Sequence, residues 1–80
     1  TEERRRDIVK SMGTIIESAH IAMRSSRHEV LDAVKKLEKD KAATQDDVKW
    51  AEEELNKKVT VYKTKVAEIE KAKTAEIMTV

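Results

Sequence analysis

The 80-residue sequence contains no cysteine, no proline and no phenylalanine, and its only glycine is Gly13. Without cysteine, the chain can form neither disulfides nor thiolate metal sites. Because proline is absent and glycine occurs once, little in the chain interrupts a helix, and aromatic residues at 2% give little support for a sheet. Apolar runs are only a few residues long, so we expect no segment that crosses a bilayer.

Charge is abundant but balanced. Charged residues make up 41% of the chain, with 17 basic and 16 acidic side chains and a net charge of +1. The net charge therefore does not indicate whether the chain binds nucleic acid, and that inference must rest on where the basic residues cluster in the sequence. The length allows one domain at most, and a domain this small buries few apolar groups. The chain begins at Thr1, so we expect either a removed leader or a longer protein.

Apolar residues recur every seven positions through the first half of the chain. The pattern predicts a helix over about residues 2–40, which Thr1 can cap. Ile8, Ile15 and Ala22 widen the apolar stripe, which indicates contact with more than one neighbouring helix. The expected heptad seam consists of Val9, Ile16, Met23, Val30 and Leu37, with Met12, Ala19, Ser26 and Ala33 as its companion row.

A second helix is predicted over about residues 45–78, after a loop at about 41–44. Thr44 and Asp47 have the spacing of a capping box. So short a connection makes the helices antiparallel. The fold class is therefore all-α, a long antiparallel hairpin, and we expect a third helix in cis or in trans; dimerisation into a four-helix bundle is the alternative. The second seam comprises Val48, Leu55, Tyr62 and Ile69, with Val59 and Val66 beside them.

Between Glu17 and Glu29 the first helix carries no acidic residue. His20, Arg24 and Arg27 follow i, i+4, i+7 spacing and so share one face, which we expect to point to solvent. Arginine suits phosphate because its planar guanidinium donates two hydrogen bonds at once. The stripe is a candidate RNA footprint; the alternative is an ordinary solvated basic face. His28 adds a further base to the same stretch.

Arg4, Arg5 and Arg6 form a second basic cluster at a helix N-terminus, where positive charge is unfavourable. Nucleic acid could offset that cost, or the arginines could pair with the acidic residues around them. For metals, His20 and His28 lie too far apart along a helix to share one ion, and no third ligand is evident. No nucleophile and base have catalytic spacing, and no glycine-rich phosphate loop occurs. We therefore expect no enzyme activity, no cofactor and no small-molecule substrate.

Four stretches together resemble the C-terminal half of ribosome recycling factor. They are Thr1-Glu2-Glu3-Arg4-Arg5-Arg6-Asp7, Arg24-Ser25-Ser26-Arg27-His28-Glu29, Lys36-Leu37-Glu38-Lys39-Asp40-Lys41 and Ala75-Glu76-Ile77-Met78. The resemblance implies the last two helices of the family's three-helix bundle, with the first helix and the β domain absent from this chain. It implies a nonenzymatic translation factor that binds large-subunit rRNA and helps elongation factor G to split ribosomal subunits.

The resemblance also implies site residues. Arg24 and Arg27 match arginines of the family's Arg-Asn-x-Arg-Arg-Asp motif, and Arg5 matches the arginine of the opening motif. His28 stands where the family usually has arginine, Ser25 replaces asparagine, and His20 stands where many members have arginine or lysine. These departures suggest a divergent member, for which an organelle is one candidate source. For localisation, we expect a bacterial cytoplasm or a mitochondrial or plastid matrix, and not secretion. The alternative function is a helical hairpin that docks on a protein partner without RNA contact.

Overall fold

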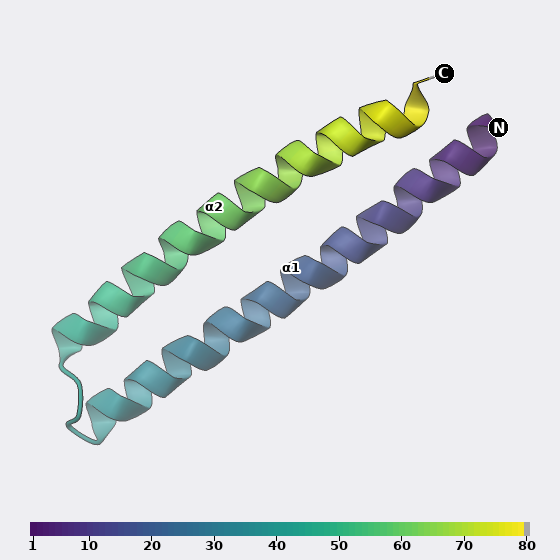
Figure 1. The fold of residues 1–80 in the computed structure, drawn as a ribbon. Helices are drawn as coiled ribbons and strands as arrows, with labels where there is room; N and C mark the ends of the chain where they lie inside the picture. Colours follow the sequence, from purple (N-terminus) through teal and green to yellow (C-terminus); the bar gives the residue numbers. More distant parts are fainter. Residues whose placement is uncertain (80) are drawn as a thin grey trace.

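The computed structural model describes residues 1–79, which form an extended hairpin of two helices (Figure 1). α1 spans Glu2–Lys39 and α2 spans Gln45–Met78. The helices run antiparallel in a single layer, and the start of α1 and the end of α2 lie at the same end of the hairpin. The Cα atoms extend over 60 × 16 × 9 Å. With no strand in the described part of the chain, the predicted all-α antiparallel hairpin is confirmed.

Both helix starts are capped by threonine, as the sequence predicts. The Thr1 hydroxyl accepts a hydrogen bond from the Arg4 backbone N–H at 3.2 Å. At the start of α2, the Asp47 N–H donates to the Thr44 hydroxyl at 3.1 Å, and the Thr44 N–H donates to the Asp47 carboxylate at 2.8 Å. Both halves of the capping box are thus present, and two backbone donors that the helix cannot satisfy find partners.

The end of α1 turns the chain back on itself. The Ala42 N–H donates to the Leu37 carbonyl at 2.8 Å and the Lys41 N–H donates to the Glu38 carbonyl at 3.0 Å, which is the hydrogen-bond pattern of a Schellman motif. Glycine usually occupies the left-handed position of this motif, but here Lys41 does, with φ of 64°. The sequence placed the stop around Asp40 to Ala43 without a glycine signal, and the helix ends at Lys39.

The seam between the helices differs from the predicted heptad seam. Val9, Ile16 and Met23 are half-buried as expected, but Val30 and Leu37 are each 48% exposed, and the companions Ala19, Ser26 and Ala33 are exposed. The cause is that a straight helix drifts by about 20° per heptad, so a strict seven-residue row leaves the seam after a few turns. The α1 residues that are buried or half-buried along the seam are Arg5, Val9, Met12, Gly13, Ile16, His20, Met23, Arg27, Leu31, Val34 and Glu38.

On α2 most of the predicted seam is correct. Val48, Leu55, Val59, Tyr62 and Val66 are half-buried, as the seven-residue spacing indicated. Ile69 is the exception, because it is 59% exposed and the seam passes through Val66 and Glu70 instead. The same drift between heptad spacing and a straight helix explains this error.

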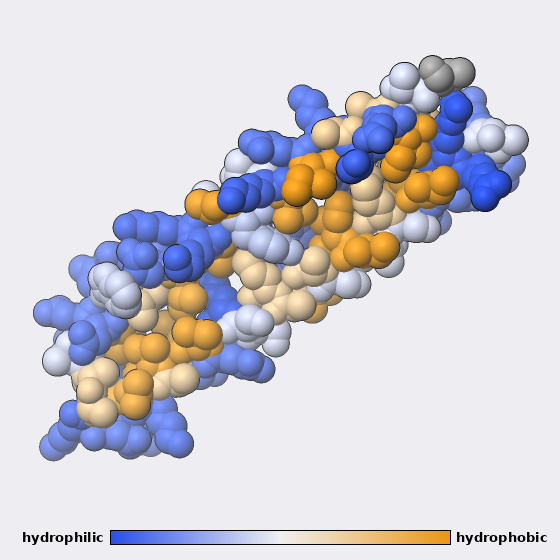
Figure 2. Space-filling view, in the orientation of Figure 1, coloured by the Kyte–Doolittle hydropathy of each residue, from blue (hydrophilic) through white to orange (hydrophobic). Residues whose placement is uncertain are grey.

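The hairpin leaves much apolar surface uncovered. Within residues 1–79 the only buried hydrophobic residue is Leu31, at 8% exposure, and no side chain is fully enclosed. Figure 2 shows a band of hydrophobic surface along one face, between hydrophilic margins. Neither described helix is apolar enough over sufficient length to cross a membrane. A shallow groove of about 310 Å³ lies between the two helices. The groove, called here the apolar groove, is lined by Met23, Ser26, Arg27, Val30, Leu55, Lys58, Val59 and Tyr62.

Candidate nucleic-acid interface

The basic stretch of α1 does not lie on one solvent-facing side, as the sequence suggested. Arg24 and His28 are exposed, but His20 and Arg27 are half-buried on the row that faces α2. The prediction of a common solvent face is therefore wrong for His20 and Arg27. It failed because the solvent side was inferred from the heptad seam, and the true seam passes through both residues. RNA contact by these side chains stays a prediction.

Arg27 is held by α2. Its guanidinium donates to the Asn56 side-chain oxygen from Nη2 at 2.6 Å and from Nε at 3.2 Å. Asparagine is neutral, and none of the ion pairs formed by residues 1–79 involves Arg27. The contact thus fixes the side chain without compensating its charge, and it leaves the Nη1 edge of the guanidinium free for an anion.

His20 packs against an aromatic side chain of α2. The His20 and Tyr62 ring centroids are 5.7 Å apart and the rings meet edge to face at 80°. The His20 Nδ1 atom is buried and has no hydrogen-bond partner among the residues described. This position suits a packing role in the seam better than a phosphate contact, because an RNA backbone approaches from solvent.

The two exposed bases of α1 each have an acidic neighbour. The Arg24 guanidinium lies 3.6 Å from the Glu17 carboxylate, and His28 Nε2 lies 3.1 Å from the Asp32 carboxylate. Both pairs are exposed, so they contribute little to stability and can be exchanged for pairs with a phosphate. Arg24 therefore remains available to an anionic partner, at the cost of its contact with Glu17.

α2 contributes basic residues that the sequence reading missed. Residues 55–67, between Glu54 and Glu68, contain no acidic side chain. The contacts of Arg27 with Asn56 and of His20 with Tyr62 place this segment beside the acid-free segment 18–28 of α1. Counting acid-free runs on both predicted helices would have found it, because an antiparallel hairpin with a short loop brings the two together. Its four basic residues are Lys57, Lys58, Lys63 and Lys65.

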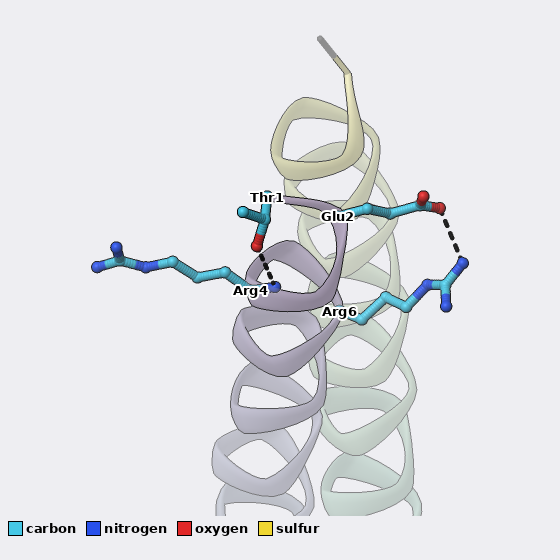
Figure 3. Close-up of polar contacts among 4 residues, drawn as sticks. All are labelled: Thr1, Glu2, Arg4 and Arg6. Atoms are coloured by element: carbon cyan, nitrogen blue, oxygen red, sulfur yellow. Dashed lines mark hydrogen bonds and ion pairs between the residues drawn. The ribbon is translucent and has the colours of Figure 1, made fainter.

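The three arginines at the start of α1 lie on different sides of the helix. Figure 3 shows Arg4 and Arg6 pointing in opposite directions, with Arg6 reaching back to Glu2. The Arg6 Nη2 to Glu2 carboxylate distance is 2.8 Å, which confirms the alternative that at least one of these arginines pairs with an acidic neighbour. Arg5, the predicted rRNA contact of this cluster, is half-buried on the row that faces α2.

The remaining chemistry of the surface is limited. Across residues 1–79, no group of three histidine or acidic side chains lies close enough to hold a metal ion. The pKa of Asp47 is lowered from its ordinary value by the hydrogen bond from the Thr44 backbone and then by the one from the Thr44 hydroxyl. Because that shift belongs to a helix cap, it marks structure and not a reactive site.

Comparison with known proteins gives a consistent result. Residues 1–78 match the family model described as ribosome recycling factor. Proteins named ribosome-recycling factor are similar over the whole chain in Campylobacter lari, at 44% identity, and in Caldicellulosiruptor bescii, at 41% identity. One from Lactococcus lactis subsp. cremoris is 53% identical over 57 residues, which is 71% of this chain and 31% of the relative.

The match covers only part of each relative. All 80 residues align, but they span 43% of the Campylobacter lari protein and 44% of the Caldicellulosiruptor bescii protein. These comparisons confirm the resemblance read from the four sequence stretches. The chain belongs to the ribosome recycling factor family.

Proposed function

We propose that this chain is the helical arm of a nonenzymatic factor that recycles ribosomes after termination. Family membership over residues 1–78 is the observation that carries the proposal. In this role the hairpin binds large-subunit rRNA through Arg24, His28 and the free edge of Arg27. The compartment follows from the ribosome that it serves, either a bacterial cytoplasm or the matrix of an organelle.

The geometry of the basic residues supports rRNA binding. Arg24 is exposed, and Arg27 is fixed by a neutral partner that leaves its charge uncompensated. A fixed guanidinium loses less conformational freedom when it binds phosphate, so pre-organisation favours the contact. His20 and Arg5 face α2, so we assign them a supporting role in the seam, with any phosphate contact secondary.

The apolar groove supports a third helix as a partner, in cis or in trans. Ile8, Ile15, Val30 and Leu37 are large apolar side chains that remain 46–69% exposed. Large exposed apolar side chains along one side of a helix, together with the apolar groove, favour a contact site. A helix laid along the groove would complete a three-helix bundle. A monomeric 80-residue chain that melts cooperatively, measured by sedimentation and circular dichroism, would contradict this part of the proposal.

Elongation factor G is the proposed protein partner of the complete factor. The family resemblance assigns that contact to a β domain, which the described hairpin lacks. We therefore expect the hairpin to supply ribosome affinity and expect subunit splitting to need the longer polypeptide. This division of roles is tested by measuring the splitting of ribosomes into subunits by light scattering, in the presence of elongation factor G and GTP. The 80-residue chain is compared with the polypeptide as the cell makes it.

The first experiment measures rRNA binding. The polypeptide is co-sedimented with large ribosomal subunits across a salt series, beside its Arg24→Ala/Arg27→Ala variant. Each lost phosphate contact lowers the slope of log affinity against log salt by roughly 0.7 to 0.9. We expect the double variant to lose between about one and two units of slope.

A matched control separates specific contacts from net charge. Lys36→Ala/Lys39→Ala removes the same two charges from the last turn of α1. We expect this variant to bind like the wild type. Equal losses in both variants, or none in either, would refute binding through the central basic residues. Arg24→Ala alone gives the cleanest measurement, because Arg24 makes no contact with α2 among the recorded hydrogen bonds and ion pairs of residues 1–79.

A further inference from the structure

We infer that the RNA-binding surface spans both helices and that Lys63 of α2 contacts RNA phosphate beside Arg24 and Arg27. The inference rests on the proposed rRNA binding and extends it to an element that the α1 motif does not include. It depends on three observations: the pairing of two acid-free segments, the side of the hairpin on which each lysine lies, and the absence of a competing acidic partner for Lys63.

The first observation is that the acid-free segments of the two helices coincide in space. Segment 18–28 of α1 lies against segment 55–67 of α2, with Arg27 bonded to Asn56 near one end and His20 packed on Tyr62 near the other. Chance placement of acidic residues, at 16 in 80, would seldom leave both segments clear at the same level of the hairpin. This arrangement favours a polyanion, because fewer carboxylates at this level of the hairpin repel phosphate.

The second observation separates the two sides of the hairpin. On α1, Ser26 lines the apolar groove, and Arg24 lies about 160° from it around the helix at about 100° per residue. On α2, Lys58 lines the groove, and Lys65 shares with it a second hollow beside Tyr62. Arg24 therefore lies on the side opposite to the groove, and Lys58 and Lys65 lie on the groove side.

Lys63 lies on the side of Arg24. It is about 160° from Lys65 around α2 and about 20° from Asn56, the residue that holds Arg27. The register set by His20 and Tyr62 places Lys63 roughly 7 Å along the axis from Arg24, at about 1.5 Å rise per residue. The two helices thus present Arg24 and Lys63 on the side opposite to the groove that the third helix is proposed to fill. Arg27 lies on the seam, where it also borders the groove.

The third observation concerns competition. Lys63 is exposed and takes part in none of the ion pairs recorded for residues 1–79, whereas Lys57 lies 3.3 Å from the Glu54 carboxylate. Lys63 also donates no side-chain hydrogen bond among these residues. Its ammonium group can therefore bind phosphate without giving up a partner. RNA is the partner that this surface fits, because the surface presents several cations and few apolar groups.

The test compares two lysines that lie on opposite sides of α2, one on the side of Arg24 and the other on the side of the apolar groove. Lys63→Ala and Lys65→Ala each remove one exposed charge from the same turn of α2, in the polypeptide as the cell makes it. Affinity for large ribosomal subunits is measured by co-sedimentation across a salt series. We expect Lys63→Ala to lower the salt slope by roughly 0.7 to 0.9 and to weaken binding between about fivefold and eightfold at 0.1 M salt. We expect Lys65→Ala to match the wild type and Lys63→Arg to retain binding.

The outcomes separate this inference from the proposed function. If Lys63→Ala binds like the wild type while Arg24→Ala/Arg27→Ala loses affinity, the function stands and the surface is confined to α1. Equal losses in Lys63→Ala and Lys65→Ala would also overturn the inference, because they would report only net charge. If the wild type does not bind the subunit, the proposed function fails and the inference fails with it. Thermal melts of both variants confirm that neither change unfolds α2.

Discussion

Arg27 on α1 and Asn56 on α2 are joined by two hydrogen bonds to a single oxygen, the shorter of which measures 2.6 Å. They are 29 positions apart in the sequence, and theirs are the only side-chain hydrogen bonds between the helices in the described part of the chain. The pair links the packing of the hairpin to its proposed function, since it fixes the position of a candidate phosphate-binding group.

Asn56 offers a test in which stability and RNA binding move in opposite directions. Asn56→Asp keeps the acceptor oxygen but adds a charge that compensates Arg27. We expect the hairpin to be as stable as the wild type or up to about 1 kcal/mol more stable. We expect the slope of log affinity for rRNA against log salt to fall by at most the value of one phosphate contact. Asn56→Ala, in contrast, should cost about 1 kcal/mol of stability and leave the slope unchanged. Urea melts and co-sedimentation measure the two effects. Wild-type binding by Asn56→Asp would show that the charge of Arg27 does not reach RNA.

His20 tests the corrected position of the basic stretch. Because its Nδ1 atom is buried without a partner, His20→Leu removes an unsatisfied polar group from the seam. We expect the variant to gain about 1 kcal/mol of stability in urea melts and to bind ribosomes like the wild type. Tyr62→Phe keeps the ring that His20 meets and serves as the control for packing. A stable His20→Leu variant with weakened ribosome binding would instead restore the RNA contact that the sequence suggested.

Leu37, seven residues after the groove residue Val30, tests whether a third helix covers the apolar side of α1 beyond the apolar groove. It is 48% exposed in the hairpin alone, so in the isolated 80 residues its truncation to alanine should cost little. In the polypeptide as the cell makes it, burial under a third helix would raise the cost of Leu37→Ala to about 2 kcal/mol or more. The control is Ile21→Ala, because Ile21 is 52% exposed on the side away from the groove. Urea melts that give Leu37→Ala and Ile21→Ala the same small cost would show that no helix covers Leu37.

Asp47 makes the stability of α2 depend on pH in the acidic range. Hydrogen bonds from the Thr44 backbone and hydroxyl lower the pKa of the Asp47 carboxyl in the folded chain. The stabilisation is therefore complete above the unfolded pKa, about 3.9, and is lost as the pH falls through the lower folded value. We expect Asp47→Ala to lose less stability than the wild type between about pH 4 and pH 2. Circular dichroism melts along that series provide the measurement, and parallel curves for the two proteins would contradict the cap's role.

Gly13 lies within α1, where glycine has no structural task. A Cβ atom built at this position would meet nothing within 4 Å. Gly13→Ala should therefore raise the free energy of unfolding by about 0.5–1 kcal/mol, because alanine loses less backbone entropy on forming a helix. The reverse change at an exposed helical position, Ala22→Gly, should cost about as much and serves as the matched control. No gain in a urea melt of Gly13→Ala would indicate that another element approaches the helix at this point.

The helices and their ends could be read from the sequence because the signals are local. Threonine at both starts, acidic residues in both first turns and the near absence of glycine and proline act over a few residues. A capping box needs only Thr44 and Asp47 at the correct spacing, and it formed as predicted. The short loop then left an antiparallel hairpin as the only compact arrangement of two long helices.

The composition of the site depended on tertiary structure, because it is set by how one helix faces another. Over the four heptads from Val9 to Leu37, a straight helix drifts by about 80°, which moves Val30 and Leu37 out of the seam. Arg5, Ile16, Arg27 and Glu38 instead recur every eleven residues along it. Only the packed hairpin shows that Arg27 bonds Asn56 and that Lys63 lies on the side of Arg24. Local signals in the sequence specify the helices. The angle at which the helices meet sets which charges lie together, because that angle depends on contacts between residues far apart in the chain.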